Sequence, residues 1–178
     1  MKFIESKIDG VFLVEENSSM DDRGEFIKFI HCEEFDKINL PTDFKESYYT
    51  ISKKDVIRGM HFQLPPFDHE KLITVLKGSI VDVIVDLRKT SSTYKTVAEF
   101  QLNASLKQSL YLPKGIAHGF KSLADDTLVL YHVTTVYHNE SDTGILYSSI
   151  PYNWNCEEPV VSKRDLSFVS LEEFRSPF

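Results

Sequence analysis

Short runs of apolar and β-branched residues, separated by turn residues, dominate the chain. Eight runs are rich in Val, Ile, Tyr, Phe and Thr, which is typical of strands. They are residues 11–15, 25–30, 47–52, 71–77, 79–87, 96–102, 108–112 and 127–137. The run at 79–87 alternates with period two, so Val81, Val83 and Val85 share one face and Asp82 and Ile84 share the other.

Helical patterns are short and weak, around 33–38 and 170–174. Without crossover helices, a parallel α/β fold is disfavoured. Many short strands at about ten-residue spacing predict an all-β sandwich or barrel. The run at 127–137 is predicted as one strand, with Val129, Tyr131, Val133, Thr135 and Tyr137 on one face.

Composition narrows the class of protein. The 178 residues are 42% hydrophobic and 26% charged, which predicts a single globular domain over 1–178. The net charge is −7 and no basic run exists, so we expect no nucleic-acid partner. Cys32 and Cys156 lie far apart and form no CxxC pair. With neither a signal-peptide pattern nor an apolar stretch of ~20 residues, we expect a cytoplasmic protein with no membrane partner.

Four clusters contain side chains that could perform chemistry. They are RGMHFQ at 58–63 with HEK at 69–71, LPKGIAHGF at 112–120, the pair Tyr131 and Tyr137, and SKRD at 162–165. Each has a structural alternative, because strand histidines are often hydrogen-bonded and strand tyrosines often belong to the core. Taken alone, Arg23 in DDRG could serve a turn, and Asp165 could be a solvated charge.

The histidine-bearing segments resemble the paired motifs of the cupin superfamily. PKGIAH at 113–118 has the spacing of the second cupin motif, whereas HFQ at 61–63 lacks the second histidine of the first. A metal site made of His61, Glu70 and His118 is an alternative, since a first-row metal needs three or four such ligands. That alternative predicts a metal-dependent cupin such as a dioxygenase.

A larger set of motifs resembles the dTDP-4-dehydrorhamnose 3,5-epimerase family. The set is DDRGEF at 21–26, RGMHFQ at 58–63, KL at 71–72, VDLRKTSSTY at 85–94, LPKGIAHGF at 112–120, Tyr131, Tyr137 and SKRD at 162–165. The resemblance covers residues from about 10 to 166. It implies a metal-free cupin-type jelly-roll barrel with short peripheral helices, acting without a cofactor on a nucleotide-activated 4-keto-6-deoxyhexose. It also implies a homodimer that exchanges N-terminal strands within about 1–30, with a peripheral segment at about 150–178.

Several positions depart from the family's usual sequence. Lys28 replaces an acidic residue near the nucleobase, and Glu46 and Tyr48 stand where Gln and Asn are usual. Asp142 replaces Glu, and YSSI at 147–150 replaces Trp-Asp-Asp-Pro. These departures predict shared chemistry but leave the nucleotide open among dTDP, UDP, CDP and GDP. A 3,5-epimerase is favoured over a 3-only or 5-only enzyme.

The resemblance also implies roles that the reaction itself requires. A C4 ketone acidifies the hydrogens on C3 and C5, so epimerisation needs a base, an acid on the opposite face and a cation at the ketone oxygen. His61 suits the base, and Asp165 would orient its ring. Lys71 would stabilise the enolate oxygen, and Tyr131 would return the proton.

The remaining candidates would bind substrate. Arg23 and Arg58 would clamp the diphosphate through bidentate contacts, and His118 would line the sugar pocket. The other expected contacts are Phe26, Lys28, Gln63, Tyr137 and Asp142. A noncatalytic sugar-binding barrel remains an alternative, although binding alone needs no acid–base set.

Overall fold

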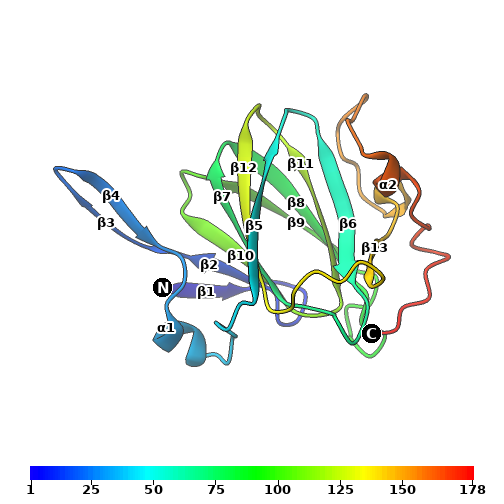
Figure 1. Ribbon diagram of the computed structural model, residues 1–178, viewed down its shortest axis with the longest axis horizontal. Helices are drawn as coiled ribbons and strands as arrows, with labels where there is room; N and C mark the ends of the chain where they lie inside the picture. Colours follow the sequence, from blue (N-terminus) through cyan, green and yellow to red (C-terminus); the bar gives the residue numbers. More distant parts are fainter.

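Two antiparallel sheets face each other and build most of the molecule. The computed structural model describes all residues from 1 to 178 (Figure 1). The first sheet has the order β1 (Lys2–Glu5), β2 (Phe12–Glu15), β10 (Gln108–Leu112), β7 (Lys71–Lys77), β12 (Thr127–Val133) and β5 (Glu46–Ser52). The second has the order β13 (Asp142–Gly144), β6 (Ile57–Gln63), β11 (Ile116–Ser122), β8 (Ser79–Asp86) and β9 (Val97–Asn103).

The main core lies between the sheets. Ile73 of β7, Val129 of β12 and Ile84 of β8 belong to one fully buried cluster. The opposite face of β8 is also covered, because Val83 and Val85 pack in a second cluster with residues of the C-terminal segment. Strand β8 is therefore apolar on both faces, with its acidic residues as the exceptions.

A third sheet is a separate hairpin made of β3 (Asn17–Asp21) and β4 (Gly24–Lys28). Figure 1 shows the hairpin extending away from the two large sheets. Every residue of both strands is exposed. Lys107 contacts Glu25 of the hairpin, but the hairpin's apolar side chains Met20 and Phe26 face solvent in the isolated subunit.

The helices are short and peripheral. Helix α1 (Cys32–Asp36) buries Phe35 against the outer face of the first sheet. Helix α2 (Lys163–Leu166) lies beside β6, and its N-cap Ser162 accepts a hydrogen bond from the Asp165 N–H. A single 3₁₀ turn spans Tyr147–Ser149. None of these helices has the length and apolarity that crossing a bilayer requires.

The all-β prediction is confirmed, with corrections. The sheets are open, so the cupin-like fold is a sandwich rather than a closed barrel. The predicted strand at 127–137 ends at Val133, and Thr135 and Tyr137 lie in the loop that follows. The predicted helix at 170–174 is a turn, and the sequence pattern gave no indication of α2, β1, β3, β6, β11 or β13.

Candidate active site

A cavity of about 320 Å³ opens between the two sheets. Its size suits a sugar ring, since small-molecule sites start near ~300 Å³. Most of the predicted site residues line it: Arg58, His61, Gln63, Lys71, His118, Tyr131, Tyr137 and Asp142. Asp165 lies directly behind His61. Arg23, Phe26 and Lys28 are the three predicted residues that the structure leaves outside.

His61 and Asp165 form a hydrogen-bonded pair. His61 lies on β6, and its Nε2 is 2.9 Å from Asp165 Oδ1. A carboxylate accepts the Nε2–H, which leaves the lone pair of a neutral ring on Nδ1. The pair is thus arranged as a base with a fixed tautomer.

The chain holds Asp165 rigidly. Its Oδ2 accepts from the Gly59 N–H at 3.1 Å, and its side chain is almost fully buried. Burial alone would raise the pKa of Asp165, but the hydrogen bonds from His61 and Gly59 hold that pKa below its ordinary value. Gly59 has φ +140°, and a Cβ there would meet Gly119 Cα at 2.4 Å. Glycine is therefore required where β6 approaches β11.

Lys71 places a buried ammonium beside the base. Its Nζ donates to the His61 carbonyl at 3.2 Å, and only 6% of the residue is exposed. Burial lowers the pKa of Lys71 to about 8, against the opposing effect of the nearby Asp142 and Asp82 carboxylates. Lys71 is therefore a cation at neutral pH that no carboxylate contacts closely.

A second His–Asp pair was not predicted. His118 Nε2 lies 2.7 Å from Asp82 Oδ2, and both side chains are buried. Burial lowers the pKa of His118 and raises the pKa of Asp82, so the histidine is neutral near pH 7. Asp82 Oδ1 has no hydrogen-bond partner. The only sequence signal for Asp82 was an acidic side chain among apolar residues of a predicted strand.

Tyr131 lies on β12, in the sheet opposite His61. The residue is 5% exposed, and its ring meets the His118 ring edge-to-face at 6.0 Å. Burial raises the pKa of Tyr131 well above its ordinary value. The phenol therefore keeps its proton at neutral pH and can donate it.

Polar groups surround the mouth of the cavity. Arg58 is anchored by a hydrogen bond from Nε to Ser52 Oγ at 3.1 Å. Arg164, which was not predicted, contacts Asp142 Oδ2 at 2.6 Å. Tyr137 is more than half exposed and offers a free aromatic face.

Gln63 lines the cavity but has internal partners. Its Nε2 donates to the Phe67 carbonyl at 2.7 Å, and its Oε1 accepts from the His138 N–H at 2.7 Å. The amide therefore ties two loops together.

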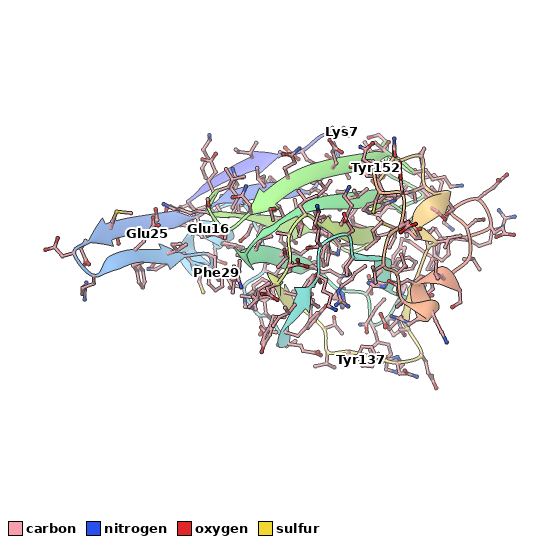
Figure 2. The ribbon with its side chains drawn as sticks, turned by 90° about the horizontal axis from the view of Figure 1, so that it is seen from above. Lys7, Glu16, Glu25, Phe29, Tyr137 and Tyr152 are labelled. Atoms are coloured by element: carbon pink, nitrogen blue, oxygen red, sulfur yellow. The ribbon has the colours of Figure 1, made fainter.

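The three predicted site residues that lie outside the cavity are on the β3–β4 hairpin. Arg23 pairs with Asp21 at 2.5 Å, and Phe26 and Lys28 are exposed on β4. Figure 2 shows Glu25 on this hairpin, far from Tyr137 at the cavity. Within one chain, these three side chains do not reach the site.

The alternative metal triad is not assembled. No group of three or more His, Cys, Asp or Glu side chains is placed to hold an ion together. Glu70 instead faces the Tyr111 hydroxyl, where it adds to burial in raising the pKa of that phenol.

A carboxylate-bound histidine on one sheet and a phenol on the other, across a sugar-sized cavity, fit the class of cupin-like sugar epimerases. The family model described as dTDP-4-dehydrorhamnose 3,5-epimerase matches residues 5–173. The chain belongs to this family, as its motifs predicted, and its members are isomerases.

Individual relatives and solved structures support the same family assignment. The dTDP-4-dehydrorhamnose 3,5-epimerase of Methanothermobacter thermautotrophicus is 33% identical, over 97% of this chain and 95% of the relative. The crystal structure of the Bacillus anthracis enzyme, with TDP and PPi bound, gives a TM-score of 0.92 at 35% identity, over 96% and 99% of the two chains. The Legionella pneumophila enzyme, in complex with dTDP-4-keto-L-rhamnose, gives 0.91 at 30% identity, over 98% and 94%.

Proposed function

We propose that the protein inverts C3 and C5 of a dTDP-linked 4-keto-6-deoxyhexose through an enolate, in deoxysugar biosynthesis. One observation carries this proposal: His61 and Tyr131 face the same cavity from opposite sheets. Inversion requires that a proton leave one face of a carbon and return to the other. A base and an acid on opposite walls meet that requirement.

His61 performs the first half of the reaction. Its Nδ1 removes the proton from a carbon next to the ketone, while Asp165 stabilises the imidazolium that forms. The electron pair of the broken C–H bond moves to the C4 oxygen. Lys71 places its ammonium at that oxygen in a buried setting, where a charge has its largest effect.

Tyr131 performs the second half. The enolate carbon takes the phenolic proton on the face opposite His61, and the C4 ketone re-forms. The phenolate then recovers a proton from water, and the imidazolium loses one. The raised pKa of Tyr131 keeps the donor protonated before each turnover.

The nucleotide extends from the cavity mouth. Arg58 and Arg164 both line the cavity and supply guanidinium groups for the diphosphate. The exposed ring of Tyr137 is available to stack on the base. The ligand named in the Bacillus anthracis structure supports thymidine as the default nucleoside.

Arg23, Phe26 and Lys28 reach the site of a second subunit in this proposal. An exposed hairpin with apolar side chains and an arginine needs a partner surface, and a second copy of the chain provides one. The homodimer predicted from the family resemblance would exchange this hairpin. Both cysteines are free, which suits the predicted cytoplasmic location.

Deuterium wash-in tests the function directly. The protein is incubated in D₂O with dTDP-, UDP-, CDP- and GDP-linked 4-keto-6-deoxyglucose, and NMR follows deuterium and configuration at C3 and C5. We expect deuterium at both carbons of the dTDP sugar, with inversion at both. Binding without deuterium incorporation would instead support a noncatalytic sugar-binding protein.

A further inference from the structure

Strand β5 brings a second phenol into the cavity. Alternate residues of a strand share a face, so Glu46, Tyr48 and Thr50 all line the cavity. Tyr49 lies on the other face and is 62% exposed. Tyr48 is the direct cross-strand neighbour of Tyr131 in the pairing of β5 with β12.

The two phenols are parallel. The rings of Tyr48 and Tyr131 stack with centroids 4.9 Å apart and planes 18° from parallel. Both belong to the sheet that faces His61 across the cavity. A substrate atom that Tyr48 contacts would therefore have Tyr48 on one side and His61 on the other, and the same holds for Tyr131.

The Tyr48 hydroxyl has no hydrogen-bond partner within the chain. The carboxylates of Asp142 and Glu46 lie near it. Tyr48 is 39% exposed at the cavity mouth; the burial of the rest of the side chain, with these two charges, raises the pKa of Tyr48 to about 12, so the phenol is protonated at neutral pH. Tyr131 is buried more deeply, with only 5% exposed.

The proposed reaction needs a proton at two carbons, C3 and C5, on either side of the C4 ketone. A general acid must lie within ~3.2 Å of the atom that it protonates. Tyr131 is fixed by burial and by its strand, so in one pose of the sugar its hydroxyl serves one of the two carbons. A neighbouring phenol on the same wall can serve the other.

We propose that Tyr48 is a second proton donor, so that Tyr48 and Tyr131 each protonate one of the two carbons beside the ketone. This inference rests on the proposed 3,5-epimerase function. In each half-reaction His61 takes a carbon-bound proton, and the electron pair forms the enolate. That pair then forms a new C–H bond with the phenolic proton, and water reprotonates the phenolate.

The test measures each carbon separately. Wild type, Tyr48→Phe and Tyr131→Phe are incubated with dTDP-4-keto-6-deoxyglucose in D₂O, and NMR resolves exchange and inversion at C3 and C5. Phenylalanine keeps the stacked ring and removes only the hydroxyl. We expect Tyr48→Phe to lose inversion at one carbon by ~10²-fold or more. Tyr131→Phe should lose inversion at the other, and the unaffected carbon of each variant should stay near the wild-type rate.

Tyr49→Phe is the matched control, since it removes a hydroxyl from the same strand outside the cavity and should leave both carbons unchanged. Wild-type behaviour of Tyr48→Phe, or an equal loss at both carbons, would overturn the second donor alone. So would a wild type that inverts a single carbon, because one donor then suffices. A wild type that exchanges neither carbon would instead overturn the proposed function, and this inference with it.

Discussion

The cavity wall and the β3–β4 hairpin hold their predicted site residues in opposite ways. In the wall, Lys71 and His118 are less than a tenth exposed, as is Asp165 directly behind the wall, and all three have partners within the same chain. On the hairpin, Arg23 and Phe26 are exposed, and Arg23 contacts only Asp21 two residues away.

This difference fits two proposed roles: proton transfer at the cavity wall and nucleotide binding by the hairpin. Proton transfer needs atoms held within a few tenths of an ångström, which packing in one chain's core provides. In the proposed dimer, contacts to the nucleotide come from a hairpin that docks from the partner, and such contacts tolerate larger displacements. Substitutions in the wall should therefore change turnover, whereas substitutions on the hairpin should change binding.

Lys71→Met should give the largest of these effects. Losing the cation at the enolate oxygen should lower kcat by ~10²–10³-fold. The same change should raise the free energy of unfolding at pH 7 by roughly 1–3 kcal/mol, because a buried ammonium with a lowered pKa disfavours the folded state. Steady-state kinetics and urea unfolding measure the two.

The pH dependence follows from the same pKa. The folded pKa of Lys71 is about 8 and the unfolded value is 10.5, so between them the unfolded chain binds more protons. Wild-type stability should therefore gain a contribution as pH rises from 8 to 10.5, while activity falls as the ammonium is lost. Lys71→Met should lack that gain.

Lys121→Met is the control for burial alone. Lys121 is equally buried, but it donates to the carbonyls of Trp154 and Asn155 in the C-terminal segment. This variant should lose stability and largely keep its turnover per folded molecule. Unchanged kcat in Lys71→Met would remove Lys71 from the oxyanion role.

Arg23→Ala should have an intermediate effect, confined to binding. Loss of a charge-assisted contact to a phosphate should lower kcat/KM by roughly 10–100-fold with little change in kcat. Mixing Arg23→Ala with His61→Ala subunits tests whether the hairpin acts on the partner. If it does, each mixed dimer has one intact site. Because half of the dimers in an equal mixture are mixed, kcat/KM should return to about a quarter of the wild-type value. No recovery after subunit exchange would place Arg23 in its own chain's site, or outside any site.

Lys28→Glu should have the smallest effect. Lysine offers only donors, whereas glutamate accepts a hydrogen bond from the ring N–H of thymine or uracil. We expect the variant to shift the kcat/KM ratio toward dTDP over CDP and GDP sugars by a few-fold, on the scale of an exposed charge contact. Unchanged ratios would remove Lys28 from the nucleotide site.

Sequence patterns predicted the all-β class but missed the two strands that carry the histidines. Strand β11 is buried along its whole length, although it contains His118, Gly119 and Lys121. Its period-two pattern is therefore absent, and the same holds for β6, with Arg58 and Gly59 among its apolar residues. Strand β12, which carries Tyr131, keeps its alternation and was predicted, so the loss concerns only the two histidine-bearing strands.

Site residues that belong to a recognisable motif were predicted from the sequence. Asp82, which belongs to no motif and acts through a long-range contact, was not. The His61–Asp165 pair spans 104 positions, and the SKRD motif still indicated it through resemblance. Asp82 belongs to no such motif, and its contact with His118 exists because β8 pairs with β11. That pairing depends on the whole fold rather than on a local pattern.

In the proposed reaction His61, held by Asp165, removes the proton from carbon. The most direct test of this step is the rate of deuterium exchange at C3 and C5 in wild type, His61→Ala and Asp165→Asn, with circular dichroism as the check on folding. We expect both variants to stay folded and His61→Ala to lose exchange at both carbons by ~10²–10⁴-fold. Asp165→Asn should also be severely impaired, because the amide no longer stabilises the imidazolium. Near-wild-type exchange in His61→Ala at both carbons would exclude His61 as the base.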